Sequence, residues 1–288
     1  MTVLEALNWA TDFLKGHQVD APRLNAELLL ARSMDVRREE LYIRLHSQIT
    51  EGEKGALDAF VQRRVSGEPL QYILGHQEFW SFDVKVDCQV LIPRPETELL
   101  VEQTLSILES PSLRKSPLVL ELGTGSGAVA ISLAREVKEI FIVATDVSVE
   151  ALDLAKVNAV RAGVEGEIAF VHGDLFDALQ SSKEKGPFDV IVSNPPYVSR
   201  PDIASLAKEV KNEPRIALDG GEDGLDFHRR IISEAPAHLR AGGWLLLEMG
   251  QGQGAGVSAL IQEKADFLRP QILSDLSGIE RVVKVQKR

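Results

Sequence analysis

The sequence predicts an α/β protein in which a small bundle of helices precedes a doubly wound sheet. Two observations support this prediction. Apolar residues recur at helical spacing through the first 75 residues. From Pro117 onward, short continuous apolar runs alternate with amphipathic stretches, an order that indicates strands with helices on both faces of a sheet. The 288 residues are enough for one large or two ordinary domains.

Composition and charge limit the classes of function. Hydrophobic residues make up 44% of the chain and charged residues 26%, which is typical of a soluble globular protein. No signal segment or membrane-spanning run is visible, so we expect a cytoplasmic protein with no membrane partner. A net charge of −11 argues against a directly bound nucleic acid, although it leaves room for a small basic groove. The single cysteine, Cys88, excludes a disulfide within the chain and a cysteine-rich metal site, and we expect no metal.

The first 75 residues contain clear signals for helix starts. Thr2–Glu5 and Thr50–Glu53 both fit the capping box, in which a Thr hydroxyl and a Glu carboxylate satisfy free backbone N–H groups. Pro22 marks another start, since proline is tolerated in the first turn. No catalytic constellation is visible here. We therefore assign residues 1–75 to an N-terminal helical bundle with a role in recognising a partner, an inference from arrangement alone.

A β-hairpin linker is expected over residues 76–93. Residues 77–86 alternate between apolar and polar, and a second apolar run, residues 90–92, follows a polar turn. Two prolines then flank Arg94 and halt the strand, before an amphipathic helix over residues 99–108. The charged residues at this point have two interpretations that the sequence leaves open. In the first, the charged residues stabilise the start of the helix. In the second, Arg94 faces a substrate pocket.

A glycine turn follows the first strand of the predicted sheet. Leu118–Leu122 is a continuous apolar strand, Gly123–Gly127 is the turn, and a helix begins at Ala128. Glycines allow backbone N–H groups to approach a ligand at the positive end of the following helix. The spacing is G-x-G-x-G, whereas the dinucleotide pattern is G-x-G-x-x-G with Ala tolerated last. The turn alone therefore leaves a phosphate-binding interpretation open.

The next two strands also end in carboxylates. The strand over residues 140–145 leads to Asp146, where an acidic residue accepts both hydroxyls of a ribose in either a nicotinamide or a methyl-donor enzyme. The alternative is that Asp146 caps the helix over residues 148–162. The strand over residues 168–171 leads to Asp174, which could accept a hydrogen bond from an adenine amino group. Three successive strand ends therefore indicate a site for one nucleoside.

The fourth strand, residues 188–193, ends in the segment Asn194-Pro195-Pro196-Tyr197. Prolines lack an N–H group and fix φ, so this segment must leave the sheet as a stiff loop. It presents the amide of Asn194, a free carbonyl and the ring of Tyr197, which together suit a planar NH2 group. Taken alone, it is equally a turn that ends a strand. A dehydrogenase needs no NH2 receptor beside its nucleoside site, whereas an enzyme that methylates amino groups does.

These motifs resemble a known family. Glu121–Gly127 together with Asn194–Tyr197 resembles S-adenosylmethionine-dependent methyltransferases that modify planar amino groups. Leu91–Glu98 and Glu213–Asp226 are similar to the PrmC/HemK family, the release-factor glutamine methyltransferases. The resemblance covers nearly the whole chain and is weakest over the first 70 residues. It implies a seven-stranded, Rossmann-like class I S-adenosylmethionine-dependent methyltransferase domain over residues 94–288.

The resemblance implies a reaction and a set of residues. The side-chain amide nitrogen (N5) of the glutamine in the Gly-Gly-Gln motif of class-1 peptide chain release factors would be methylated, and S-adenosylmethionine would become S-adenosylhomocysteine. Methylation of adenine N6 in DNA or of a ribosomal RNA base is the alternative, and a non-enzymatic nucleoside-binding module is a third hypothesis. Implied catalytic residues are Asn194, Pro195 and Tyr197, with Pro196 also binding substrate; implied cofactor contacts are Glu121, Gly123, Thr124, Gly125, Ser126, Gly127, Asp146, Asp174, Leu175 and Asn194.

Overall fold

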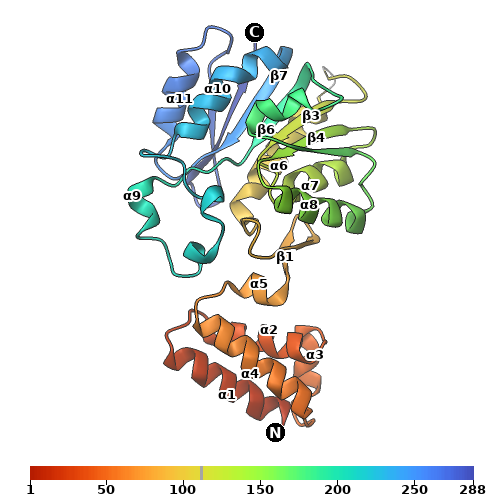
Figure 1. Ribbon diagram of the computed structural model, residues 1–288, viewed down its shortest axis with the longest axis vertical. Coiled ribbons are helices and arrows are strands. Elements are labelled where there is room, and N and C mark those ends of the chain that lie inside the picture. Colours follow the sequence, from red (N-terminus) through yellow and green to blue (C-terminus); the bar gives the residue numbers. More distant parts are fainter. Residues whose placement is uncertain (111–112) are drawn as a thin grey trace. The chain divides into compact units, whose positions relative to one another are not determined.

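The computed structural model describes residues 1–110 and 113–288 and divides into two compact units. The first, here called the bundle, comprises Met1–His76 and Ala207–Asn212 (Figure 1). The second, here called the sheet domain, comprises Gln77–Leu206 and Glu213–Arg288. Among the described residues, no helix combines the length and apolar character needed to cross a membrane.

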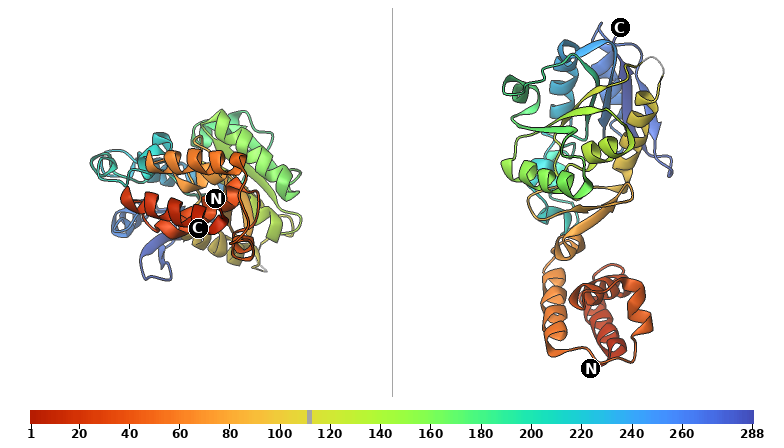
Figure 2. Two further views of the ribbon diagram at one scale, coloured as in Figure 1. Left: turned by 90° about the horizontal axis from the view of Figure 1, so that it is seen from below. Right: turned by 90° about the vertical axis from the view of Figure 1, so that its right-hand side faces the viewer.

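The bundle is held together by an apolar core contributed by its longer helices. Leu7 of α1, Leu29 and Leu30 of α2 and Leu57 of α4 are completely buried in this core. Both predicted capping boxes form, at the starts of α1 and α4. The helices, red to orange in Figure 2, are α1 (Val3–Gly16), α2 (Pro22–Ser33), α3 (Arg38–Ile43), α4 (Glu51–Val65) and α5 (Leu70–Leu74).

A distant segment completes the bundle, and nothing in the sequence pattern indicates it. Ala207–Asn212, which contains the short helix η3 (Val210–Asn212), packs against the end of α4. Arg64 forms an ion pair with Glu209, and Asn212 Nδ2 donates a hydrogen bond of 2.7 Å to the carbonyl of Gly67. Because Arg64 is itself buried, its unpaired charge would be costly, so Glu209 contributes to the stability of the bundle.

The linker hairpin is shorter than its sequence pattern predicts. It consists of β1 (His76–Phe79) and β2 (Phe82–Lys85), and no strand forms over residues 90–92, so that part of the prediction is wrong. The chain reverses at Trp80 and Ser81, which have φ values of 49° and 55°. This conformation is uncommon for residues with a Cβ but suits a two-residue hairpin turn. Glu98 supports it by accepting a hydrogen bond of 2.9 Å from the Trp80 backbone N–H.

The sheet domain has the predicted fold class, which is confirmed. In the described part of the chain its main sheet has seven strands in the order β5-β4-β3-β6-β7-β9-β8, parallel except for β9, which runs antiparallel to β7 and β8. The strands are β3 (Leu118–Leu122), β4 (Phe141–Asp146), β5 (Ile168–His172), β6 (Phe188–Ser193), β7 (Leu239–Glu248), β8 (Gln271–Ser274) and β9 (Glu280–Gln286).

Helices cover both faces of the sheet, so its central strands are apolar on both sides. Leu118, Leu120 and Leu122 of β3 share a core with α10, α11 and η2, while α6, α7 and α8 lie on the opposite face (Figure 1). Parallel strands end at one edge of the sheet, which brings the predicted strand-end residues together. The helices are α6 (Glu98–Leu108), α7 (Ala128–Glu136), α8 (Val149–Ala162), α9 (Arg200–Ile203), α10 (Asp226–His238) and α11 (Gly254–Gln262), with η1 (Pro95–Thr97), η2 (Leu175–Gln180) and η4 (Arg215–Ala217).

Candidate active site

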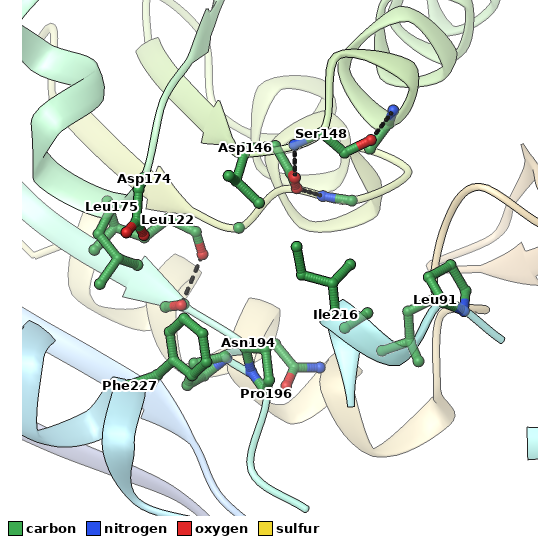
Figure 3. Close-up of a pocket in the computed structure, with 18 of the residues that line it drawn as sticks. Leu91, Leu122, Asp146, Ser148, Asp174, Leu175, Asn194, Pro196, Ile216 and Phe227 are labelled. Atoms are coloured by element: carbon green, nitrogen blue, oxygen red, sulfur yellow. Dashed lines mark hydrogen bonds between the residues drawn. The ribbon is translucent and has the colours of Figure 1, made fainter. Parts of the chain in front are cut away.

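A cavity of about 240 Å³ opens at the carboxyl ends of β3, β4, β5 and β6 (Figure 3). Asp146 and Asn194 lie on opposite sides of it, and Leu91 and Ile216 face Leu175 and Phe227 across its width. The predicted site residues that line it are Gly123, Gly125, Asp146, Asp174, Leu175, Asn194, Pro195 and Pro196.

The glycine turn forms one wall of the cavity. Gly125 has a φ of 54°, a left-handed conformation that glycine adopts without strain. A Cβ at Gly123 or Gly125 would meet no atom within 4 Å, so the inner face of the turn is open to a ligand. The Gly125 N–H donates a hydrogen bond of 2.8 Å to Asp146 Oδ2, which joins the ends of β3 and β4. The turn therefore provides a close backbone approach to any occupant.

Four predicted contacts, Glu121, Thr124, Ser126 and Gly127, lie behind this wall and do not line the cavity. Glu121 is almost completely buried, and its Oε2 accepts hydrogen bonds from the Thr124 hydroxyl (2.6 Å) and the Ala130 N–H (3.2 Å). Burial raises the pKa of the Glu121 carboxyl to about 8. These residues thus hold the shape of the turn, and a direct contact with a cofactor stays a prediction for each of them.

Asp146 lies at the end of β4 with both carboxylate oxygens supported by backbone N–H groups. Oδ1 accepts from Ser148 (2.9 Å) and Oδ2 from Gly125 (2.8 Å). Burial raises its pKa, against the opposing effect of these hydrogen bonds. The alternative that Asp146 caps α8 is wrong, because the Ser148 hydroxyl does so by accepting from Ala151 (3.0 Å). The remaining lone pairs of Asp146 are available to two neighbouring hydroxyl groups.

The far end of the cavity combines a carboxylate with apolar side chains. Asp174 forms an ion pair of 2.7 Å with Arg230 of α10, and Leu175 and Phe227 lie close by (Figure 3). Phe227 and Arg230 were not among the site residues predicted from the sequence. A signal was present, because the segment that carries the family resemblance, Glu213–Asp226, ends one residue before Phe227. An aromatic ring beside a carboxylate suits a flat base with an amino group.

The Asn194 loop supplies two hydrogen-bond acceptors. Asn194 Nδ2 donates a hydrogen bond of 3.1 Å to Thr97 Oγ1. No described residue donates a hydrogen bond to Asn194 Oδ1 or to the Pro195 carbonyl. Asn194, Pro195 and Pro196 all line the cavity, so the stiff loop expected from the sequence reaches the site.

Tyr197 does not line the cavity. Its ring lies against Gly250, its hydroxyl donates to Glu248 Oε1 (3.3 Å), and its carbonyl accepts from Gln253 Nε2 (2.9 Å). Burial raises the pKa of the Tyr197 phenol, which therefore stays protonated. Burial also raises the pKa of the Glu248 carboxyl, to about 7. Tyr197 is thus anchored at its hydroxyl end, and packing of its ring on a substrate stays a prediction.

The segment over residues 213–226 braces this loop. A Cβ at Gly220 would lie 2.7 Å from the Tyr197 Cα, and one at Gly224 would lie 2.4 Å from the Tyr197 carbonyl oxygen, so only glycine fits at either position. Glu213 forms an ion pair with Arg94 and accepts a hydrogen bond of 3.0 Å from the Ile92 N–H. Arg94 does not line the cavity, and its partner is this segment instead.

Comparisons with known proteins place the chain in a family. Residues 5–75 match the PrmC N-terminal domain and residues 97–222 match the methyltransferase small domain. Release factor glutamine methyltransferases from Moorella thermoacetica and Koribacter versatilis are 38% and 39% identical to it, and each alignment covers 100% of this chain and 99% of the relative. The chain belongs to the release factor glutamine methyltransferase family. This confirms the family expected from the segments Leu91–Glu98 and Glu213–Asp226, within the class of methyltransferases that the glycine turn and the Asn194 loop indicate.

A solved structure supports the fold in the same way. A methyltransferase from Pyrococcus furiosus superposes with a TM-score of 0.51 at 21% identity, over 71% of this chain and 88% of that one. Similarity at this level establishes the class I methyltransferase fold of the sheet domain. It carries no information on substrate.

Proposed function

We propose that this protein uses S-adenosylmethionine to methylate the side-chain amide nitrogen (N5) of the glutamine in the Gly-Gly-Gln motif of class-1 peptide chain release factors. The observation that carries the proposal is a pair of acceptors, Asn194 Oδ1 and the Pro195 carbonyl, to which no residue in the described part of the chain donates, at a cavity whose other side carries Asp146. The names of the full-length relatives support the choice of a glutamine amide. The reaction belongs in the cytoplasm, where release factors act.

The residues around the cavity fit the cofactor. Asp146 would accept hydrogen bonds from the two ribose hydroxyls, and Asp174 from the adenine amino group, with the base between Leu175 and Phe227. The open inner face of the glycine turn would lie against the methionine portion. When bound, S-adenosylmethionine supplies an electrophilic methyl group on a sulfonium centre, and S-adenosylhomocysteine is the product.

Orientation is the main task of the protein groups. An amide nitrogen is a poor nucleophile, because its lone pair is delocalised into the carbonyl. Asn194 Oδ1 and the Pro195 carbonyl would accept its two hydrogens and aim the nitrogen at the methyl group, while Tyr197 would limit movement of the amide plane. Such positioning contributes about 7–11 kcal/mol in favourable cases. The nitrogen becomes strongly acidic as it is methylated, so water suffices to take the proton and no general base is assigned.

A transfer assay with labelled cofactor tests this function. Purified protein should label an unmethylated class-1 release factor and leave unmethylated DNA and ribosomal RNA unlabelled. Mass spectrometry should then locate the methyl group on the glutamine of Gly-Gly-Gln. Labelling of a nucleic acid instead would favour adenine or another base as the acceptor and would overturn the proposal.

The same proposal gives the bundle the role of recognising the release factor. The bundle has its own core, and on α3 it exposes two adjacent apolar side chains, Tyr42 (50% exposed) and Ile43 (85%). Ile43→Glu should raise the KM for an intact release factor about 30-fold, since burying an isoleucine contributes about 2 kcal/mol. The KM for a short Gly-Gly-Gln peptide should not change.

Leu276→Glu is the matched control for this experiment. Leu276 is fully exposed, but it belongs to the sheet domain. Steady-state kinetics with both substrates should separate the two variants. Equal KM values for the release factor in Ile43→Glu, Leu276→Glu and the unchanged protein would exclude this surface of α3 from recognition.

A further inference from the structure

A short relay of polar side chains leads away from the Asn194 amide into the interior of the sheet domain. Asn194 Nδ2 donates a hydrogen bond of 3.1 Å to Thr97 Oγ1. The Thr97 hydroxyl in turn lies near the buried carboxyl of Glu248, at the end of β7, and lowers its pKa. Glu248 Oε1 accepts from the Tyr197 hydroxyl, and Oε2 has no hydrogen-bond partner among the described residues, so it is a buried acceptor to which the Thr97 hydrogen can point. Thr97 and Glu248 are both buried and both lie outside the cavity. Neither touches the site for the reacting groups, so any role in the reaction must act through Asn194.

The chemistry of the three groups gives this relay a direction. An ionised carboxylate can only accept hydrogen bonds, whereas a hydroxyl has one hydrogen to donate and lone pairs to accept with. When Glu248 is ionised, the Thr97 hydrogen points to it, and Thr97 Oγ1 can then only accept from Asn194. The Asn194 NH2 group is thereby held at Thr97, and Oδ1 is left facing the cavity. The orientation of an asparagine amide, which the side chain could otherwise reverse, is fixed by a charge two groups away.

The orientation decides whether the loop can bind an amide. With Oδ1 in the cavity, Asn194 accepts a hydrogen from the NH2 group of the acceptor. With the amide reversed, two NH2 groups would face each other and no hydrogen bond could form. We propose that Thr97 and Glu248 are positioning residues for methyl transfer, which hold the Asn194 carbonyl oxygen toward the acceptor. This inference rests on the proposed function.

The surroundings of Glu248 make the relay sensitive to pH. Burial raises the pKa of Glu248 to about 7 and the nearby Glu96 carboxylate acts in the same direction, while the hydroxyls of Thr97 and Tyr197 and the Arg281 guanidinium lower it. His228 Nε2 contacts the Glu248 carbonyl oxygen (2.9 Å), and burial lowers the pKa of His228, so it adds no charge at neutral pH. When Glu248 is protonated, the Thr97 hydroxyl no longer has to direct its hydrogen to the carboxyl. Thr97 can then donate to Asn194, and the Asn194 amide can reverse.

Two variants test the role of the Thr97 hydroxyl. Thr97→Val keeps the shape of the side chain and removes its polar atom, and it should lower kcat for a Gly-Gly-Gln peptide about 100-fold, as expected for a misaligned reacting group. The Kd for S-adenosylmethionine should stay within about twofold of its original value. Thr97→Ser, which restores a hydroxyl, should recover most of the lost kcat.

Thr104→Val is the control, because Thr104 is buried in α6, the helix that begins directly after Thr97, and its hydroxyl donates to the Leu100 carbonyl. It removes a buried hydroxyl without touching the relay, so it should leave kcat unchanged. An unchanged kcat in Thr97→Val, or an equal loss in Thr104→Val, would overturn the proposal.

The pH profile separates positioning from general damage to the fold. In the unchanged protein, kcat should fall tenfold per pH unit below a pKa of about 7, the value for Glu248. In Glu248→Gln, which has no group to titrate at this position, this acid limb should be absent. An acid limb that persists in Glu248→Gln would assign the titration to another group and overturn the proposal.

A readout that needs no turnover keeps the inference separate from the proposed function. The side-chain NH2 resonances of Asn194, assigned by their loss in Asn194→Asp, should shift with a midpoint near pH 7, and this shift should vanish in Thr97→Val. If the protein labels no glutamine peptide but the titration behaves as stated, the function fails and the relay holds. If peptide is labelled but no titration reaches Asn194, the relay fails.

Discussion

The glycine turn after β3 and the Asn194 loop after β6 form opposite walls of one cavity, and each is backed by a buried glutamate. Glu121 accepts hydrogen bonds from Thr124 and Ala130, three and nine residues away along the chain. Glu248 accepts one from Tyr197, 51 residues away. The cofactor wall is therefore supported by its own local sequence, whereas the acceptor wall is supported only once the whole sheet has formed. A motif whose hydrogen-bond partners lie close by in the chain can be recognised in a sequence. A motif whose partners lie far away in the chain cannot.

Removal of the acceptor at the centre of the second wall should have the largest effect. Asn194→Ala deletes the Oδ1 atom that receives an amide hydrogen, and loss of one oriented group of this kind costs about 10²–10³ in kcat. The Kd for S-adenosylmethionine, measured by titration calorimetry, should change little. A parallel loss of cofactor affinity would mean that Asn194 acts chiefly as a cofactor contact, and the division of the cavity into two walls would no longer hold.

Removal of a carboxylate from the cofactor wall should give the opposite pattern. Asp146→Ala should raise the Kd for S-adenosylmethionine about 10- to 100-fold, because hydrogen bonds to a charged group contribute about 1.5–3 kcal/mol each. At saturating cofactor, kcat for the peptide should be nearly preserved. Asp153→Ala, on the exposed side of α8, is the control, since Asp153 forms an ion pair with the exposed Lys156 of the same helix. An unchanged Kd in Asp146→Ala would show that Asp146 does not bind the ribose of the cofactor.

A further effect concerns stability rather than catalysis. The pKa of Glu121 rises from its ordinary value of 4.5 to about 8 in the folded protein, so the folded state holds this proton more tightly than the unfolded chain. The free energy of unfolding should therefore fall as pH rises between these values, by at most roughly 1.4 kcal/mol per pH unit. Glu121→Gln cannot ionise and can still accept both hydrogen bonds at one oxygen.

Denaturant titrations of Glu121→Gln between pH 5 and pH 8 would measure this difference. The curve of the variant should be flatter than that of the unchanged protein and should cross above it as pH rises. The exposed Glu165→Gln is the control and should follow the unchanged protein. Curves that run parallel for Glu121→Gln and the unchanged protein would show that Glu121 keeps an ordinary pKa.

The same contrast explains what could be predicted from the sequence. The strands of the sheet and the positions of Asp146 and Asn194 follow from short runs of apolar residues and from glycine and proline, whose effects are local. The sequence indicates Thr97 only as part of the family-like segment Leu91–Glu98, because its contact with Asn194 spans 97 residues. Phe227 and Arg230 reach the cavity from α10, and helical spacing alone does not show which side of a helix faces a ligand.

In the linker, the prediction from the sequence was wrong about where the strands end. Alternation over residues 77–86 correctly indicated extended chain, but it could not show where the chain reverses. Trp80 and Ser81 adopt left-handed conformations that their residue types do not favour, with Glu98 and Glu136 as hydrogen-bond partners of Trp80. Tertiary contacts overrode local preference at this turn.

The membership of Ala207–Asn212 in the bundle bears on how this protein can be recombined with its relatives. The chain passes between the two units at three places, near residues 76, 206 and 212. A bundle transplanted from a relative by a single crossover near residue 76 would meet a segment that evolved against a different α4, with Arg64 and Glu209 drawn from separate parents. Functional chimeras should therefore exchange both segments together, and the bundle is inherited as a split module rather than as an N-terminal extension.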